Sequence, residues 1–228
     1  MSPAAHELIP TSGDATLPAT RALLASGAVA GPFFTISVVL QILTRPGFDI
    51  RRHPISLLSL GDLGWIQIAT FVLTGLAIAA AAVGMRRALP SGRGAVWGPP
   101  LVGLFGLGLI AAGFFTADPS MGFPPGTAAS IPDHLSWHSA LHGVAFFTSF
   151  TALVVACFVF ARRFAGLRWR GWVAYCVASG VVAPTTVVLG MSKRRAAAVP
   201  FALAALVAFG WLTTLTVGTL AEVGRQPR

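Results

Sequence analysis

The chain has 228 residues, of which 55% are hydrophobic and only 10% are charged, and its mean hydropathy is +0.76. A water-soluble domain carries about 25% charged residues, so this composition excludes an ordinary soluble protein. The formal net charge of +9 comes almost entirely from arginine, and the arginines stand in short clusters between apolar runs. This placement indicates membrane anchoring and contact with membrane lipids, and it argues against nucleic-acid binding.

Six long apolar segments follow a polar N-terminal stretch. Residues 1–20 lack periodicity and the basic start of a signal peptide, so we expect a flexible tail there. Each apolar segment within residues 21–221 is close to the ~20 residues that a helix needs to span the hydrocarbon. The predicted spans are 22–43, 64–85, 96–116, 138–160, 171–190 and 197–220. The sequence therefore predicts an all-α, polytopic bundle of six transmembrane helices, with residues 222–228 as a C-terminal tail.

The distribution of basic residues predicts the orientation. With both termini in the cytoplasm, ten arginines fall on the inner side, and five arginines and Lys193 fall on the outer side. The long loop between the third and fourth segments contains no Lys or Arg. The positive-inside rule therefore favours a multi-pass protein of the cell membrane with both termini cytoplasmic.

Most acidic and histidine side chains fall in or beside the two longer loops on the predicted outer side. They are Asp49, Asp62, Asp118, Asp133, His53, His134, His138 and His142. The inner loops hold arginines and no acid or histidine. The positive-inside rule explains why arginines lie in the inner loops. It does not explain why His and Asp gather on the other side, and this gathering predicts a site at the outer interface.

A row of three histidines is expected at the start of the fourth helix. The run 130–133 (Ser-Ile-Pro-Asp) has the pattern of a helix start, with a serine N-cap and a proline in the first turn. A helix beginning there would carry His134, His138 and His142 on one face, because residues four apart lie one above the other. His134 and His142 would stand ~12 Å apart along the axis, so one metal ion could be held only by an adjacent pair.

This row suggests a zinc site. His138 and His142 are the better pair, because they lie nearer the bilayer, and His53 would supply a third ligand from the first outer loop. A catalytic zinc ion takes three protein ligands and keeps one position for water. Asp118 or Asp49 would then act as the base or as an orienting partner.

Other interpretations of the same residues stay open. The histidines could serve as structural hydrogen-bonding groups or in metal-free proton chemistry, since no glutamate stands between the pair as in His-Glu-x-x-His. Arg51 and Arg52 could meet a lipid headgroup or form a salt-bridged loop with Asp49 and Asp62. Trp65, Gln67 and His134 complete the candidate ligand contacts.

Several motifs together resemble a known membrane family. They are His53-Pro54-Ile55-Ser56 and Gly64-Trp65-Ile66-Gln67 within residues 49–75, residues 115–119 (Phe-Thr-Ala-Asp-Pro), and residues 138–143 (His-Ser-Ala-Leu-His-Gly). This combination resembles the bacterial membrane family catalogued as domain of unknown function 998. The resemblance covers about residues 22–220 and implies a six-helix membrane protein with no assigned activity.

A looser likeness suggests chemistry. His53, Ser56 and Asp62 precede His138-x-x-x-His142 in an order similar to that of alkaline ceramidases and adiponectin-type receptors, although those proteins usually have seven helices and carry the early motif within a helix. The likeness implies zinc-dependent lipid hydrolysis, with Ser56, Asp49 and Asp118 as candidate catalytic groups. The leading hypothesis is therefore a metal-dependent, lipid-modifying membrane enzyme. The alternatives are a non-catalytic lipid- or partner-binding protein with structural His–Asp pairs, and a proton-linked transporter or sensor.

Overall fold

The computed structural model describes residues 12–89, 92–192 and 198–225. The described elements are α1 (Ser12–Thr44), the 3-10 helix η1 (Ile55–Ser59), α2 (Gly64–Ala88), α3 (Arg93–Phe114), α4 (Trp137–Gly166), α5 (Arg170–Ser192) and α6 (Ala198–Arg225). All six α-helices are long and apolar enough to cross a membrane, and these described ranges form no strand. The predicted all-α, six-helix fold is confirmed.

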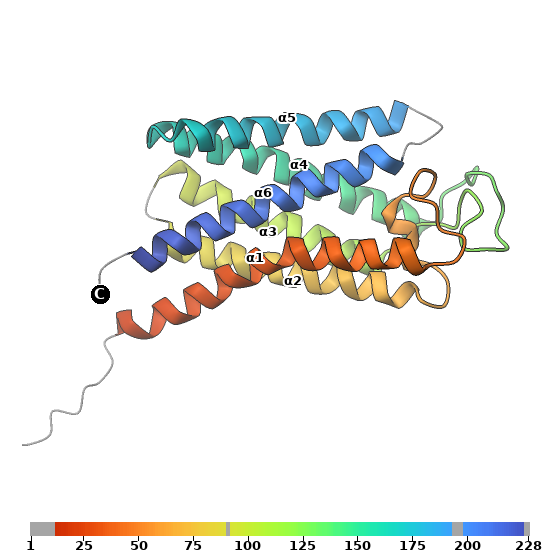
Figure 1. The fold of residues 1–228 in the computed structure, drawn as a ribbon, viewed down its shortest axis with the longest axis horizontal. Helices are drawn as coiled ribbons and strands as arrows, with labels where there is room; N and C mark the ends of the chain where they lie inside the picture. The colour runs from red at the N-terminus through yellow and green to blue at the C-terminus, as the bar shows by residue number, and fades with distance from the viewer. Residues whose placement is uncertain (1–11, 90–91, 193–197, 226–228) are drawn as a thin grey trace, which may run out of the picture.

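The six helices form a ring in chain order. Each helix packs mainly against the helices before and after it, and α6 closes the ring against α1 (Figure 1). The start of α1 and the end of α6 lie at one end of the bundle, which we call the inner end. The segments that follow α1 and α3 lie at the opposite, outer end (Figure 1). The long loops that carry the candidate residues thus share one end of the molecule.

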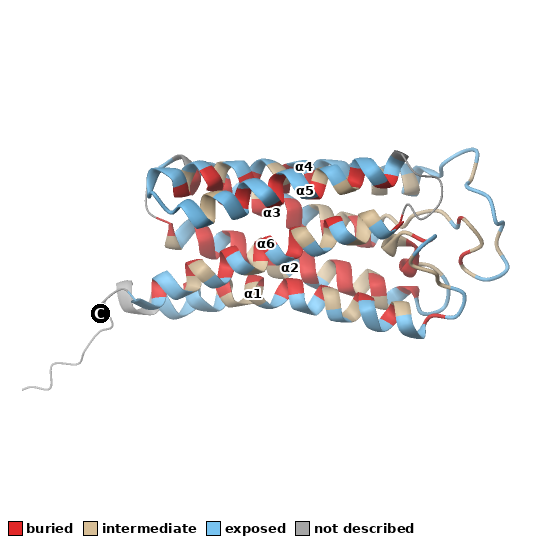
Figure 2. Ribbon diagram, turned by 45° about the horizontal axis from the view of Figure 1, so that its top comes forward, coloured by how far each residue is buried: buried red, intermediate tan, exposed pale blue. Residues whose placement is uncertain are grey.

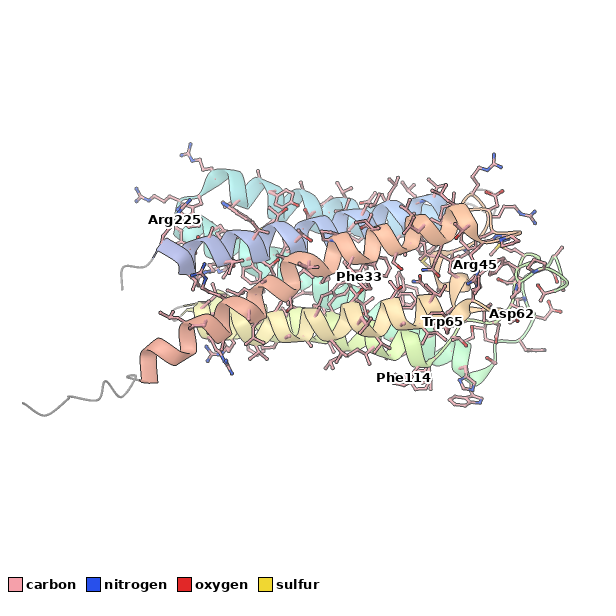
Figure 3. The ribbon with its side chains drawn as sticks, turned by 60° about the horizontal axis from the view of Figure 1, so that its bottom comes forward. Phe33, Arg45, Asp62, Trp65, Phe114 and Arg225 are labelled. Carbon is pink, nitrogen blue, oxygen red and sulfur yellow. The ribbon has the colours of Figure 1, made fainter. Side chains whose placement is uncertain are left out.

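The outward faces of the helices are apolar. Large hydrophobic side chains such as Leu43 (76% exposed) and Phe114 (69% exposed) project from the bundle, while buried residues face the ring interior (Figure 2). Figure 3 shows Arg225 at the inner end, and Arg45, Asp62 and Trp65 at the outer end. Since most of the large exposed side chains between these polar ends are hydrophobic, the surface matches a bilayer.

Aromatic side chains from several helices meet inside the ring. Phe34 of α1 stacks on Phe209 of α6 with ring centroids 4.2 Å apart, and Phe105 of α3 lies 5.8 Å from Phe209. Between α2 and α3 the backbones approach so closely that a Cβ atom added at Gly75 would lie 2.5 Å from the carbonyl oxygen of Gly106. Small residues permit such close packing of helices in lipid.

Several helices extend beyond the predicted spans. Helix α1 begins at Ser12 and so includes residues 12–20 of the predicted tail, while residues 1–11 lie outside the described residues. Helix α6 continues to Arg225, so residues 222–225 are helical as well, and residues 226–228 are outside the described ranges. The reason is that an existing helix gains one hydrogen bond for each residue added and needs no new nucleus.

Candidate functional site

The start of α4 differs from the predicted one. Its N-cap is Ser136, whose Oγ accepts a hydrogen bond from the backbone N–H of Ser139 at 3.2 Å. The Asp118 carboxylate accepts from both the N–H of Ser136 (2.8 Å) and its hydroxyl (2.6 Å). The predicted start at Ser130 is wrong, because the carbonyl of Ser130 accepts from the N–H of Met121 and this segment folds back as a loop.

The three histidines therefore do not form one row. His134 lies exposed in the loop before α4. His138 is exposed in the first turn and stacks on Trp137, with ring centroids 3.5 Å apart. His142 lies one turn further into α4 and is half-buried.

Asp118 acts as an anionic group at the N-terminus of α4. The hydroxyl and the N–H of Ser136 hold the pKa of Asp118 below its usual range, with smaller contributions from Ser139 and from the charge of His138. An ionised carboxylate at this position also complements the positive end of the helix dipole. In this structure Asp118 thus fixes the loop to the helix.

His53 connects the two outer loops. Its Nδ1 accepts from the backbone N–H of Asp49 at 2.9 Å, so the ring proton resides on Nε2, which donates to the carbonyl oxygen of Met121 at 3.2 Å. The ring is 3% exposed and lies 5.3 Å from Phe48 and 5.5 Å from Phe123, centroid to centroid. Both ring nitrogens are therefore used by the backbone, and we call these five residues the loop clasp.

The charged residues of the first outer loop pair locally. Arg51 donates to the Asp49 carboxylate from Nε (3.2 Å) and Nη2 (3.3 Å) as well as from its backbone N–H (2.9 Å). These contacts lower the pKa of Asp49 and raise that of Arg51. Arg52 donates to the same Met121 carbonyl as His53, at 3.3 Å. The salt-bridged interpretation of this loop is confirmed for Asp49 and Arg51.

Arg45 is a buried cation whose role the sequence did not single out. It is 8% exposed, and its Nη2 donates to the carbonyl oxygens of Leu58 (3.0 Å) and Leu60. Its guanidinium lies 5.9 Å from the centre of the Phe123 ring. Burial lowers the pKa of Arg45, an effect that the nearby charge of Asp62 partly offsets. Arg45 thereby holds η1 and the second outer loop to the end of α1.

The predicted zinc ligands do not fit a metal ion in this arrangement. Both nitrogens of His53 bond to the backbone, and Nδ1 of His142 lies 2.7 Å from the carbonyl oxygen of Phe115. Among the described residues, no group of three or more His, Cys, Asp or Glu side chains is placed to hold a metal ion. The structure does not bring His53 together with His138 and His142.

Gln67 and Trp65 are also separate from the histidines. Gln67 is fully buried and accepts from Nε2 of Gln41 at 2.7 Å, which joins α2 to α1. Next to this pair, the hydroxyls of Ser37 and Thr70 lie 2.6 Å apart. Trp65 is 64% exposed on the outside of α2.

A cavity of about 370 Å³, which we call the outer cavity, lies inside the outer half of the ring. Its described lining includes seven phenylalanines: Phe34, Phe71, Phe105, Phe146, Phe147, Phe150 and Phe201. Residues 54–56 of η1 and its N-cap border the cavity, and the polar side chains in its lining are Ser56, His142 and Ser149. Of the predicted site residues, the structure therefore brings Ser56 and His142 together at one cavity.

His142 lines this cavity, and one hydrogen bond fixes its ring. A carbonyl oxygen only accepts, so Nδ1 carries the proton that it donates to Phe115, and Nε2 of the neutral ring is left as an acceptor. The hydroxyl of Ser149 donates to the carbonyl of Phe146 at 3.1 Å.

The outer cavity reaches the side of the bundle. Phe147 of α4 is 50% exposed and Met191 of α5 is 62% exposed, and both line the cavity. Phe147 lies ten residues beyond Trp137, which is ~15 Å along the helix axis. With Trp137 at the membrane interface, Phe147 would lie at the depth of the hydrocarbon.

The family described as "Protein of unknown function (DUF998)" matches residues 28–218. The chain belongs to this family. The match includes both outer loops and every candidate site residue of this DUF998 protein. No curated protein and no solved structure matches the chain.

The phenylalanines of the outer cavity were not recognised from the sequence of the DUF998 chain. They come from α1, α2, α3, α4 and α6, and each stands within an apolar run where a cavity wall and a close-packed core look alike. A usable signal was the density of phenylalanine in α4, where Phe146, Phe147 and Phe150 follow His142 within eight residues.

Proposed function

We propose that this protein binds the apolar chain of a membrane lipid in the outer cavity, with the polar part of the lipid at His142 and Ser56. The observation that carries the proposal is the cavity itself, lined by phenylalanine and located within membrane-spanning helices. Ligand pockets of ~300–1,000 Å³ with mostly apolar walls and a few polar groups are typical of small-molecule sites.

The lining chemistry favours an uncharged, apolar ligand portion. Among the described lining residues there is no Lys, Arg, Asp or Glu. A charged group placed against these rings would lose its hydration without a partner, which is costly. Nε2 of His142 can accept one hydrogen bond, so a hydroxyl or amide near the head of the lipid is the matching donor.

The position of the cavity supports a ligand that arrives from the bilayer. The exposed Phe147 and Met191 open one side of the cavity to the outside of the bundle, where a bilayer lipid could enter. At the outer end, residues 54–56 cover it, and Arg45 holds η1 in place through the Leu58 and Leu60 carbonyls. Arg45 thus stabilises the segment that closes the outer end of the apolar cavity.

Of the functions predicted from the sequence, non-catalytic lipid binding is therefore better supported than hydrolysis. Zinc-dependent hydrolysis stays a prediction without support from the geometry, because the expected ligands are separated. Elemental analysis of purified protein tests it directly. Near-stoichiometric zinc that is lost in both His138→Ala and His142→Ala would favour the enzyme over simple lipid binding.

The decisive test fills the cavity with a side chain. A Cβ atom at Gly143, which lines the cavity, would meet nothing within 4 Å, so Gly143→Leu adds bulk there without a clash at the backbone. Gly210 in α6 has the same open surroundings and does not line the cavity, so Gly210→Leu is the matched control. Lipid retained through detergent purification is then extracted and quantified by mass spectrometry.

We expect the wild type and Gly210→Leu to retain about one lipid per protein, and Gly143→Leu to lose it. Equal retention by both variants would overturn the proposal, as would a wild type that retains none and takes up none from added lipid. Thermal unfolding of each variant separates loss of binding from loss of fold.

A further inference from the structure

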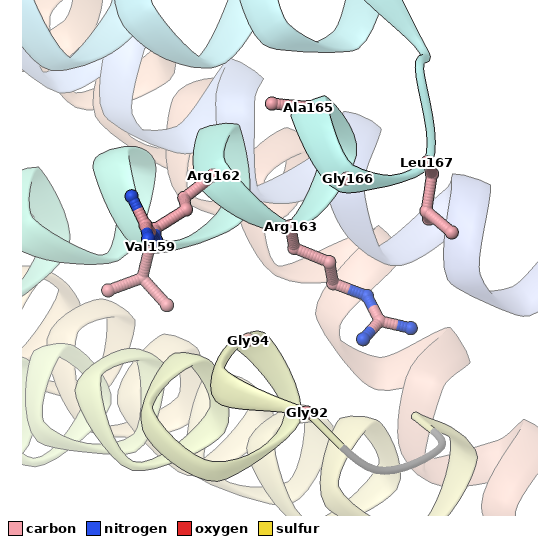
Figure 4. Close-up of a pocket in the computed structure, with 8 residues that line it drawn as sticks. All are labelled: Gly92, Gly94, Val159, Arg162, Arg163, Ala165, Gly166 and Leu167. Carbon is pink, nitrogen blue, oxygen red and sulfur yellow. The ribbon is translucent and has the colours of Figure 1, made fainter.

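A second hollow lies at the inner end of the bundle, between the start of α3 and the end of α4. This inner groove has a volume of about 710 Å³, and its described walls include Gly92, Gly94, Val159, Arg162 and Arg163 (Figure 4). We propose that the inner groove binds the phosphate group of an anionic membrane phospholipid. The site is separate from the outer cavity and does not depend on its function.

The charge of the groove is positive. Arg162 is exposed and Arg163 is half-buried, and no acidic residue is among the described lining residues. Within the described part of the chain, neither guanidinium forms an ion pair within 4.0 Å. Glu222 of α6 interacts electrostatically with Arg163 but does not line the groove. Two arginines on one wall therefore lack a close carboxylate, and phosphate is the anion whose geometry guanidinium groups match best.

Packing holds Arg163 at the groove. A Cβ atom added at Gly94 would lie 2.8 Å from both Cβ and Cδ of Arg163, so the arginine stem rests directly on the backbone of α3. This contact orders the side chain and reduces the entropy that it would lose on binding. Gly94 is thus the residue that lets α3 and the arginine approach each other.

The N-terminus of α3 adds a second attraction for an anion. Its N-cap is Gly92, which has no side chain to accept from the first N–H groups of the helix. Those groups and the helix dipole favour negative charge at this end. Gly92 and Gly94 line the groove together with Arg162 and Arg163, whose guanidinium groups point in different directions along it (Figure 4).

The surroundings favour a lipid over a soluble phosphate. Val159 and Leu167 contribute apolar walls, and exposed Val96 and Val155 continue an apolar surface on α3 and α4. Trp97 is 61% exposed at this same end, as expected of a side chain at the membrane interface. A phosphate in the groove would therefore have acyl chains lying along the outside of α3 and α4.

The test compares two lipids with identical acyl chains. The full chain in detergent is titrated with phosphatidylglycerol or phosphatidylcholine, and bound lipid is counted by native mass spectrometry. The variant is Arg162→Gln/Arg163→Gln, and the matched control is Arg86→Gln/Arg87→Gln, an exposed arginine pair at the end of α2 outside the groove. The single variant Arg162→Gln repeats the test in a protein that should fold normally, because the Arg162 side chain is exposed.

We expect the wild type to prefer phosphatidylglycerol, with affinity about fivefold weaker for each groove arginine removed. The Arg86/Arg87 control should keep the wild-type preference. Equal losses in both pairs would show a diffuse charge effect and overturn the site. Displacement of the lipid by millimolar inorganic phosphate, with phosphate alone bound equally well, would assign the groove to a soluble anion and overturn the lipid proposal.

Discussion

His53 and Met121 join the two outer loops, because Nε2–H of His53 donates to the Met121 carbonyl 3.2 Å away while Nδ1 accepts from the N–H of Asp49. His53, which the sequence predicted to be a metal ligand, thus forms hydrogen bonds with two backbone groups. The contact also fixes the segment that runs directly into η1, the cover of the outer cavity.

Replacing His53 should destabilise the protein. In His53→Ala the Asp49 N–H loses its acceptor, the Met121 carbonyl keeps only the Arg52 donor, and the packing against Phe48 and Phe123 is lost. We expect a decrease of about 1–3 kcal/mol in the free energy of unfolding, which denaturation in detergent would measure. The control His134→Ala removes an exposed loop side chain and should change stability by less than about 0.5 kcal/mol. Equal effects would contradict the loop clasp.

The N-cap of α4 gives a second prediction. Ser136→Ala removes the acceptor for the Ser139 N–H and one donor to Asp118, and it should cost about 1 kcal/mol of stability. Ser130→Ala should cost much less, since Ser130 does not cap a helix here. Equilibrium unfolding of the two variants compares the alternatives, and a larger loss for Ser130→Ala would restore the helix start predicted from the sequence.

The lowered pKa of Asp118 predicts a stability change in acid. Since its folded pKa lies below the ordinary value of about 3.9, the ionised carboxylate stabilises the fold fully above that value and loses this contribution as the pH falls through the folded pKa. Asp118→Asn removes this titration, so its stability should fall less steeply than that of the wild type below about pH 4. Unfolding midpoints measured across this range test the point. Unchanged steepness would mean that Asp118 does not contribute.

The buried glutamine pair between α1 and α2 predicts non-additive mutations. Gln67→Leu alone leaves Nε2 of Gln41 without its 2.7 Å acceptor and should cost about 1–3 kcal/mol. In Gln41→Leu/Gln67→Leu both buried polar groups disappear, so the double variant should be more stable than the single Gln67→Leu variant. A double-mutant cycle of unfolding free energies measures the coupling. Additive losses would mean that the two side chains do not interact.

The fold could be predicted from the sequence because a bilayer imposes a length on its helices. Each apolar run of about 20 residues forms a helix, and the two loops that carry most acids and histidines lie at one end of the bundle. The helix ends were less predictable. Ser130 and Ser136 both fit an N-cap. The choice depends on Asp118, which is distant in sequence and, of these two serines, bonds to Ser136.

The candidate site was only partly predictable for a related reason. The composition located the histidines at one end of the bundle, but their partners are backbone atoms such as the Met121 and Phe115 carbonyls. The positions of these carbonyl groups depend on how the loops fold, and the order of polar and apolar residues does not specify that. The outer cavity depends on residues from all six α-helices, and its apolar walls resemble an ordinary core.

The closed ring of helices also constrains the order of assembly. If the helices enter the membrane in chain order, each of α2 to α5 can pack against the preceding helix as it inserts. The contact between α1 and α6 can form only after α6 has inserted. Helix α6 supplies Phe201, Ala204, Ala205 and Ala208 to the outer cavity. A nascent chain therefore has no complete outer cavity until its final helix inserts, and an unfinished copy would expose the phenylalanine lining to the bilayer.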